Sequence, residues 1–317
     1  MRVLVTGGAG FIGHHLVRAL LERDDSVAII DDMSTGLAGR LDGLNGNVDL
    51  VVGDIRDPQA MRRAAAGAEV IFHQAALPSV ARSVADPATS TSVNVDGTVQ
   101  VMLAAIAART RRVVLAGSSS IYGISPELPR RETQTPDPRS PYAASKVAAE
   151  YMVHSIGALH GVETAVLRYF NVFGPGQDPN SQYAAVVPLW ITAALEGKRP
   201  IVFGDGTASR DFTYIDNVVS ANLKAAVAGA PSRITVNVGC GDEFSLMELL
   251  DAIGEAAGMR LEPVFQGPRP GDVPRSRADI SAAQAAIGYE VLVPFREGVA
   301  RTFDWYRSDR AAAAEHA

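Results

Sequence analysis

The chain has 317 residues, a formal net charge of −6 and 47% hydrophobic residues, which is enough for a substantial core. An acidic chain of this kind does not fit a nucleic-acid-binding protein, and it contains no run of 18 apolar residues that could cross a membrane. The single cysteine, Cys240, excludes an internal disulfide. Met1-Arg2 leads directly into the apolar Val3, which leaves no room for a signal peptide before the first strand, so we expect a cytoplasmic protein.

The first elements predict a nucleotide-binding turn. Residues 2–6 form a short β-rich apolar run, a glycine-rich turn follows, and residues 14–21 have helical periodicity. Glycines at 7, 10 and 13 allow a tight turn and close approach of the backbone to a pyrophosphate, while the helix N-terminus offers unpaired N–H groups. Their spacing departs by one residue from the commonest dinucleotide pattern, so the surrounding strands and helices have to support the prediction.

The second predicted strand, residues 27–30, ends in Asp31 and Asp32. A carboxylate at this place can bind the ribose hydroxyls of an adenosine. The next arginine along the chain is Arg40, so a 2′-phosphate has no obvious partner. The sequence therefore predicts NAD as the cofactor and not NADP.

Strands and helices continue to alternate. Strands are expected at 48–52, 70–73 and 112–116, and a long helix at 94–108. This alternation predicts a doubly wound parallel sheet, in which ligands bind beyond the carboxyl ends of the strands. Asp54 follows one such strand, and the cluster Ser118–Ser120 follows another.

Tyr142 and Lys146 lie four residues apart in good helix formers and therefore share one helical face. A free tyrosine, with a pKa of about 10, is a poor base at neutral pH. A nearby ammonium favours the phenolate, so the pair could accept a proton from a sugar hydroxyl. The spacing of these two residues alone is weak evidence for a catalytic pair, and the motifs before it in the chain strengthen the prediction.

The second half of the chain has a mixed pattern, with helices expected at 184–195 and 246–257 and a short strand at 201–203. We interpret it as a smaller α/β lobe interleaved with the first domain. The expected division is a cofactor domain over 1–170 with a returning segment at about 214–240, and a substrate lobe over 171–213 and 241–317.

Taken together, these motifs resemble the extended short-chain dehydrogenase/reductases over nearly the whole chain. The motifs that carry this resemblance are Thr6-Gly-Gly-Ala-Gly-Phe-Ile-Gly13, Asp31, Gly53-Asp-Ile55, His73-Gln-Ala-Ala76, the serines before Tyr122-Gly123, and Tyr142 with Lys146. Four further stretches are similar to the NAD-dependent nucleotide-sugar (UDP-hexose) 4-epimerases within that superfamily: Arg168-Tyr-Phe-Asn-Val-Phe-Gly-Pro175, Phe203-Gly-Asp-Gly-Thr207, Ser209-Arg-Asp-Phe-Thr-Tyr-Ile-Asp-Asn217 and Arg269-Pro-Gly-Asp272.

The resemblance implies roles for individual residues. Tyr142 is the expected base, Lys146 supports the phenolate and the nicotinamide ribose, and Ser118 is the catalytic hydroxyl. Cofactor contacts are expected at Gly7, Gly10, Phe11, Ile12, Gly13, Asp31, Asp32, Asp54, Ile55, Gln74, Ala75, Ala76, Asn94, Tyr142, Lys146 and Tyr169. Contacts with a UDP-sugar are expected at Pro78, Ser118, Ser119, Ser120, Asn171, Arg210, Arg269, Asp272 and Ser276. Arginines and amides suit a diphosphate on physical grounds as well.

The reaction implied is a 4-epimerisation that passes through a transient 4-keto sugar, with NAD regenerated in each cycle. The related 4,6-dehydratases carry Asp-Glu directly after the catalytic hydroxyl residue, and the uronate decarboxylases carry a Glu two positions after it. This chain has Ser119 and Ser120 at these positions. A net NAD-dependent dehydrogenase remains an alternative. A regulator built on an inactive scaffold would normally have lost the tyrosine or the lysine.

The sugar is less determined. Ser276 stands where strict UDP-glucose/galactose epimerases resembling this chain have a bulky tyrosine, so an N-acetylated sugar is also expected to fit. UDP-glucuronate epimerases commonly have a threonine at the position of Asn171 and an arginine near Asp178. Because Asp178 would repel a uronate, UDP-glucuronate is the runner-up, with Arg82 or Arg275 as its possible partner.

Two further expectations concern assembly and metals. Residues 94–108 and 142–159 resemble the helices that pair in the dimers of this family, so a homodimer is expected. The histidines lack metal-ligand spacing, and no metal site is expected.

Overall fold

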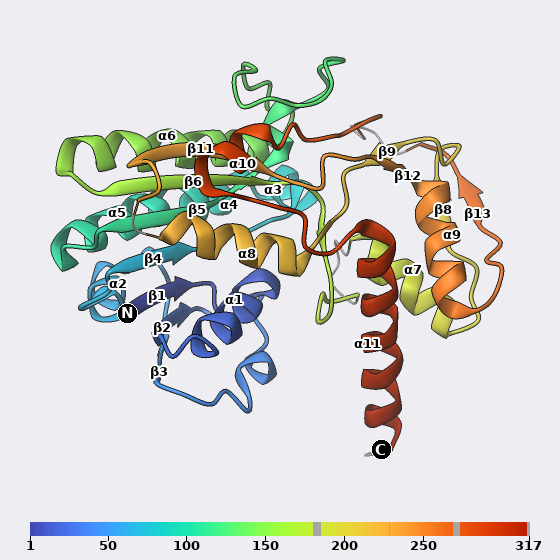
Figure 1. The fold of residues 1–317 in the computed structure, drawn as a ribbon, viewed down its shortest axis with the longest axis horizontal. Helices are drawn as coiled ribbons and strands as arrows, with labels where there is room; N and C mark the ends of the chain where they lie inside the picture. Colours follow the sequence, from blue (N-terminus) through green and yellow to red (C-terminus); the bar gives the residue numbers. More distant parts are fainter. Residues whose placement is uncertain (180–184, 228, 269–272, 316–317) are drawn as a thin grey trace.

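The computed structural model describes residues 1–179, 185–227, 229–268 and 273–315. Its centre is a seven-stranded sheet in which every pair of neighbouring strands is parallel (Figure 1). The strand order is β11-β6-β5-β4-β1-β2-β3. These strands are β1 (Arg2–Thr6), β2 (Ser26–Asp31), β3 (Val48–Val52), β4 (Val70–His73), β5 (Arg112–Ser118), β6 (Glu163–Tyr169) and β11 (Arg233–Val238).

The strand order reverses between β1 and β4. From β1 the chain builds outward through β2 and β3, and from β4 it builds in the opposite direction. The turns after β1 and β4 therefore diverge at one edge and leave a crevice between them, which is where ligands bind in open α/β sheets. The predicted doubly wound parallel sheet is confirmed.

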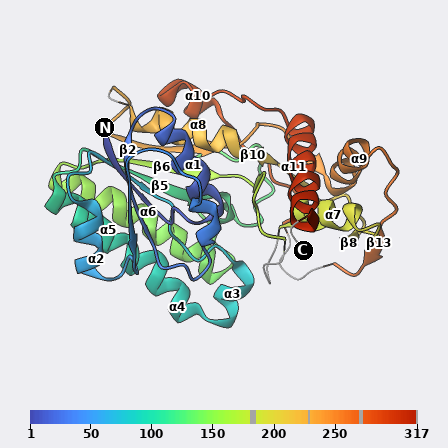
Figure 2. The ribbon, with the colours of Figure 1, turned by 90° about the horizontal axis from the view of Figure 1, so that it is seen from below.

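Helices cover both faces of the sheet because the central strands are apolar on both sides. The helices α1 (Phe11–Leu21) and α8 (Ile215–Ala226) pack on one face, and α2 (Pro58–Ala65), α5 (Gly97–Ala108) and α6 (Pro141–His160) on the other (Figures 1 and 2). Shorter elements of this domain are η1 (Ala38–Leu41), α3 (Val80–Ala85), α4 (Pro87–Thr91), η2 (Ser92–Asp96) and η3 (Ser119–Tyr122).

Several boundaries differ from the sequence prediction. The helix expected from Asn94 begins as the π-helical turn η2, and α5 itself starts at Gly97. The strand expected to end at Ala116 continues to Ser118, since its pairing with β6 extends to Tyr169. The helix expected from residue 184 starts at Val186 in the described part of the chain, and residue 184 lies outside it.

The remaining elements gather at one end of the molecule (Figures 1 and 2). Three helices and two pairs of short strands form most of this lobe. They are α7 (Val186–Leu195), α9 (Leu246–Ala257) and α11 (Phe295–Glu315), β8 (Ile201–Phe203) with β13 (Val264–Gln266), and β9 (Ser209–Arg210) with β12 (Phe244–Ser245). The strand pair β7 (Val172–Phe173) and β10 (Thr213–Tyr214) joins it to the sheet domain, and the helix α10 (Ser281–Ile287) packs against β11 and α8.

One apolar core runs through both parts of the molecule. The cluster that holds Val3 of β1 and Leu16 of α1 also contains Trp190 of α7, Phe295 of α11 and Leu249 of α9, all buried. The lobe and the sheet domain therefore share a close-packed contact.

Candidate active site

A pocket of about 790 Å³ opens at the carboxyl ends of the parallel strands. Its size is within the range of small-molecule sites. It brings together most of the residues predicted from the sequence, which come from both halves of the chain. The predicted residues that line it are Gly7, Gly10, Phe11, Ile12, Gly13, Asp31, Asp32, Asp54, Ile55, Gln74, Ala75, Ala76, Pro78, Ser118, Ser119, Ser120, Tyr142, Tyr169, Asn171, Arg210 and Ser276.

The glycine turn needs glycine at two of its positions. Gly7 has φ +71°, and a Cβ there would lie 2.7 Å from the backbone nitrogen of Ala75. A Cβ on Gly13 would lie 2.0 Å from the carbonyl oxygen of Gly7. Gly10 caps helix α1 without a side-chain hydrogen bond. Because Gly10 has no side chain, it does not block access from the pocket to the first N–H groups of α1. A pyrophosphate needs such access.

Asp31 ends strand β2 beside this turn. Its carboxylate accepts hydrogen bonds from the backbone N–H groups of Ala9 and Met33, both at 2.9 Å. Burial raises the pKa of Asp31, and these two hydrogen bonds oppose the rise. Asp32 accepts hydrogen bonds from the amide and hydroxyl of Ser34. Carboxylates fixed in this way present their remaining lone pairs to the pocket, where ribose hydroxyls could bind.

Arg40 also lines this end of the pocket, although the sequence argument gave it no part there. Its guanidinium donates to the carbonyl oxygen of Ala9 at 3.1 Å and to that of Gly176 at 2.6 Å. The guanidinium of Arg40 is therefore engaged with the backbone. The carboxylate of Asp31 lies next to it and would repel a 2′-phosphate. The glycine turn, Asp31 and the pocket shape fit NAD.

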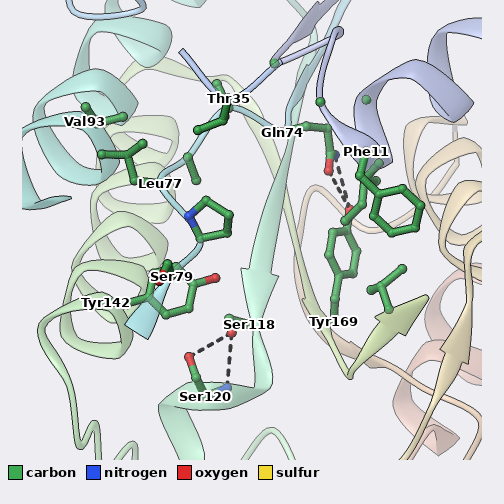
Figure 3. A pocket seen from close by; sticks show the side chains of 18 of the residues that line it. Phe11, Thr35, Gln74, Leu77, Ser79, Val93, Ser118, Ser120, Tyr142 and Tyr169 are labelled. Carbon is green, nitrogen blue, oxygen red and sulfur yellow. Dashed lines mark hydrogen bonds between the residues drawn. The ribbon is translucent and has the colours of Figure 1, made fainter. Parts of the chain in front are cut away.

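Two predicted cofactor residues have local partners. Asp54 is held by Arg56 at 2.5 Å and 3.0 Å, and this hydrogen bonding lowers the pKa of Asp54. Gln74 donates to the hydroxyl of Tyr169 at 3.2 Å (Figure 3). It also donates to the side-chain oxygen of Asn222 at 3.0 Å. Burial raises the pKa of Tyr169 to about 12, so it stays a neutral hydrogen-bonding group on the pocket wall.

Tyr142 and Ser118 form the chemically reactive end of the pocket. Tyr142 stands in the first turn of α6, which is capped by Ser140, and projects toward Ser118 at the end of β5 (Figure 3). The hydroxyls of Ser118 and Ser120 are 2.8 Å apart. Burial raises the pKa of Tyr142, while a hydrogen bond with Ser118 lowers it.

Lys146 is 5% exposed, one turn further along α6, and does not line the pocket. Burial lowers its pKa to about 8, against the attraction of Glu150. From the sequence, the ammonium was expected to lower the pKa of Tyr142. Burial of the phenol instead raises this pKa, and Lys146 is not among the groups that shift it.

Asn94 was expected to contact the cofactor and instead supports the wall behind it. This side chain is 2% exposed and does not line the pocket. The backbone N–H of Leu77 donates to the side-chain oxygen of Asn94 at 2.8 Å. The side-chain NH₂ of Asn94 donates to the carbonyl of Leu77 at 3.3 Å and to the hydroxyl of Ser145 of α6 at 2.9 Å. It ties the loop after β4 to the helix that carries Tyr142.

A buried polar network behind α6 escaped the sequence analysis. Arg168 of β6 binds both carboxylate oxygens of Glu150, at 2.6 and 3.0 Å, and donates to the hydroxyl of Tyr122 at 2.8 Å. Tyr122 in turn donates to Asn237 of β11 at 2.6 Å. The bidentate pair and its neighbours fix α6 against two strands. A glutamate four residues after Lys146 was the only sequence signal for it.

The substrate side of the pocket comes from the lobe. Asn171 donates to the carbonyl of Asp211 at 3.3 Å, and the backbone N–H of Ser276 donates to Ser209, next to Arg210. Arg269 and Asp272, expected to bind the phosphate and the uridine ribose, lie outside the described residues.

Asp211 holds together the backbone segments that surround this part of the pocket. It is fully buried, and its carboxylate accepts hydrogen bonds from the backbone N–H groups of Cys240, Gly241 and Ala278 at 2.7, 3.0 and 3.1 Å. Burial raises the pKa of Asp211 to about 6 in spite of these bonds. Asp211 thereby joins the segment after β11 to the segment that follows Ser276.

Two more arginines line the pocket. Arg82 was considered only as a partner of a uronate, and Arg130 was not considered at all. Arg130 is 2% exposed and donates to the carbonyls of Glu127 and Gly123. Arg275, the other proposed partner of a uronate, is 59% exposed at its side chain and pairs with Glu243 away from the pocket.

Over the described residues, no helix combines the length and the apolar character needed to cross a bilayer. The same part of the chain holds no cluster of three histidine, cysteine or acidic side chains arranged for a metal ion.

Residues 3–239 match the NAD dependent epimerase/dehydratase family. The chain belongs to this family. It is 41% identical over 313 residues to a UDP-glucose 4-epimerase of Mycolicibacterium smegmatis, with 97% of this chain and 99% of that protein aligned. The pocket described above thus sits where a family that uses NAD is expected to bind it.

Two solved structures of similar proteins superpose closely on this chain. The UDP-glucose 4-epimerase of Thermotoga maritima, crystallised with UDP-glucose, has a TM-score of 0.92 and 34% identity and covers 98% of this chain and 100% of its own. The UDP-N-acetylglucosamine 4-epimerase of Methanobrevibacter ruminantium, in complex with UDP-N-acetylmuramic acid, also has a TM-score of 0.92, with 36% identity over 97% of this chain and 98% of its own.

Proposed function

We propose that the protein is a UDP-sugar 4-epimerase that uses NAD. The observation that carries this proposal is the meeting of Tyr142 and Ser118 at one end of the pocket, with Ser119 and Ser120 following the catalytic hydroxyl. A dehydratase or decarboxylase needs a carboxylic acid at these two positions, and a serine cannot act as one. Proton transfer at a sugar hydroxyl is the chemistry that this arrangement supports.

Each residue has a defined task in the proposed reaction. Tyr142, as the phenolate, accepts the proton of the sugar 4-hydroxyl, and Ser118 donates a hydrogen bond to the same oxygen. When bound, NAD would supply a reversible hydride acceptor. Burial raises the pKa of Tyr142 and the hydrogen bond with Ser118 opposes this, and a positive charge on the oxidised cofactor would also favour the phenolate.

We further propose that Asn171 and Arg210 hold the UDP diphosphate while the sugar changes the face it presents to Tyr142. Both line the pocket and both come from the lobe, opposite Ser118. Arg269 and Asp272 complete this site in the proposal. In this proposal, the cofactor domain expected from the sequence binds NAD and the substrate lobe holds the diphosphate.

The proposed sugars are UDP-glucose/galactose and UDP-N-acetylglucosamine/galactosamine. Ser276 lines the pocket with a small side chain, which leaves space beside the sugar. UDP-glucuronate is the second candidate, and its support is that Arg82 and Arg130 both line the pocket. Asp178 lines it too and counts against a uronate.

A cytoplasmic homodimer is part of the proposal. Leu103 of α5 is 49% exposed, and Tyr151 and Leu159 of α6 are 62% and 80% exposed. Apolar side chains on these two adjacent helices suit burial against a second copy. Light scattering after size exclusion should give twice the mass of the chain, and a monomer at micromolar concentration would reject the dimer.

The deciding experiment is incubation of the purified protein with NAD and, separately, UDP-glucose, UDP-N-acetylglucosamine and UDP-glucuronate, followed by NMR. Conversion of one substrate to its 4-epimer is expected, and it should be lost in Tyr142→Phe. Tyr151→Phe, an exposed tyrosine on the same helix, is the matched control and should keep full activity. Accumulation of NADH without any epimer would reject the epimerase in favour of a net dehydrogenase.

A further inference from the structure

Three consecutive backbone carbonyls, those of Pro175, Gly176 and Gln177, each accept a hydrogen bond from a different element. His15 of α1 lies 2.8 Å from the carbonyl of Pro175, Arg40 of η1 lies 2.6 Å from that of Gly176, and Tyr306 of α11 donates to that of Gln177. Since a carbonyl only accepts, the ring of His15 carries its proton on Nε2. Its pKa is lowered by burial, in keeping with a neutral ring.

The segment 174–178 forms part of the cofactor pocket. Gln177 and Asp178 line it together with Asp31 and Phe11. Gly176 has φ +75° and rests on α1, where a Cβ would lie 3.3 Å from Nε2 of His14. The segment therefore lies against the first turns of α1, beside the end of the pocket where an adenosine ribose is expected at Asp31.

Arg40 is the side chain that connects this segment to the glycine turn. One of its nitrogens donates to Ala9 in the turn, and the other donates to Gly176 in the segment. Burial lowers the pKa of Arg40, and the negative charges of Asp178 and Asp31 oppose this. A half-buried guanidinium that bridges two carbonyls is a costly arrangement, which indicates a defined structural task.

Tyr306 holds the same segment from helix α11 of the lobe. Its side chain is almost fully buried, at 5% exposed, and its hydroxyl belongs to α11 in the lobe. The segment is thus fastened to the cofactor domain through Arg40 and to the lobe through Tyr306, by two contacts that share no side chain.

We propose that Arg40 is a positioning residue that retains NAD in its site, by holding segment 174–178 against the glycine turn beside the adenosine end of the pocket. Arg40 acts through the segment, so Tyr306 contributes to the same retention. The proposal concerns the cofactor alone and holds for any sugar substrate.

The test measures how fast the cofactor leaves. Each protein is loaded with NADH, mixed with excess NAD in a stopped-flow instrument, and followed by NADH fluorescence. Arg40→Ala is expected to raise the dissociation rate of NADH about tenfold or more, because the carbonyls of Ala9 and Gly176 both lose a charged hydrogen-bond donor. Tyr306→Phe removes one neutral donor and should raise the rate by a few fold. The matched control Arg63→Ala removes an exposed arginine of α2 outside the pocket and should leave the rate unchanged.

Further readouts separate retention from general damage. At saturating NAD the turnover number of Arg40→Ala should stay within about threefold of wild type, and the double variant should release NADH little faster than Arg40→Ala, because both contacts act on one segment. An unchanged rate in Arg40→Ala would overturn the proposal. So would a faster rate in Arg40→Ala combined with a wild-type rate in Tyr306→Phe, because Arg40 would then act on the cofactor directly. If Arg40→Ala fails to fold, Tyr306→Phe alone decides.

Discussion

Glu150 and Arg168 form a buried bidentate ion pair, with N–O distances of 2.6 and 3.0 Å, one helical turn behind Lys146. The pair joins the catalytic helix α6 to strand β6, and the hydroxyl of Tyr122 extends it toward β11. Glu150 therefore stabilises the fold through Arg168 and also raises the pKa of Lys146.

Replacing Glu150 by Gln should therefore affect both properties. Removing one partner of a buried pair leaves Arg168 uncompensated, and the free energy of unfolding should fall by about 3 kcal/mol. Because Glu150 raises the pKa of Lys146, the basic limb of the pH–rate profile should also move to lower pH. Urea denaturation and the pH dependence of kcat/KM measure the two effects. Glu290→Gln, which breaks an exposed pair with Lys224, should change neither by much.

Lys146 should have a stability cost of its own in the protein without ligands. Its folded-state pKa of about 8 lies below the unfolded value of 10.5, so the unfolded chain binds more protons between these values and this contribution to stability rises with pH. Lys146→Met should be more stable than wild type by up to about 3 kcal/mol at pH 7, and the difference should shrink toward pH 10.5. A difference that is independent of pH would contradict the assignment. Its activity should be lost even where its stability rises.

Asp211→Asn should loosen the substrate side of the pocket. An asparagine has one acceptor oxygen, so it cannot serve all three backbone N–H groups that the carboxylate binds, and its own NH₂ would face one of them. We expect a loss of about 2 kcal/mol in stability and a KM for the UDP-sugar raised severalfold. An NAD affinity equal to wild type would locate the damage in the lobe. An unchanged KM would show that Asp211 does not position the substrate residues.

Ser276→Tyr should narrow the choice of sugar. A tyrosine at this lining position would fill the space beside the sugar, which an N-acetyl group needs and a hydroxyl does not. The ratio of kcat/KM for UDP-N-acetylglucosamine to that for UDP-glucose should fall by about tenfold or more. Ser281→Tyr, on α10 and outside the pocket, is the control. An equal loss for both sugars would mean that Ser276 does not face the 2-position.

Local sequence patterns were sufficient for the sheet and the glycine turn. The strands at 2–6, 48–52 and 70–73 depend on neighbouring residues only, and the structure has them as predicted, although the first helix starts at Phe11 and not at residue 14. Strand ends that are far apart in the sequence then meet at one edge because the sheet is parallel. Ser118 lies at such a strand end, and Tyr142 reaches it from the first turn of α6.

Contacts between distant segments were beyond the sequence. Arg40 reaches Gly176 across 136 positions, and nothing near either residue indicates the bond. The resemblance implied that Asn94 contacts the cofactor, whereas in the structure its amide is bonded to the backbone of Leu77. Helical spacing gives the distance from Tyr142 to Lys146 but not how deeply both groups are buried, and burial is what raises the pKa of Tyr142.

The apolar cluster that contains both Val3 of the sheet domain and Phe295 of the lobe also bears on the proposed reaction. To reverse the configuration of a carbon, hydrogen has to return to the face opposite the one it left. An enzyme with a hinge between its lobes could achieve this by moving one wall of the site. Here that movement would separate packed side chains. In the proposed reaction we therefore expect the ligand to swing between the walls, with its diphosphate as the fixed end.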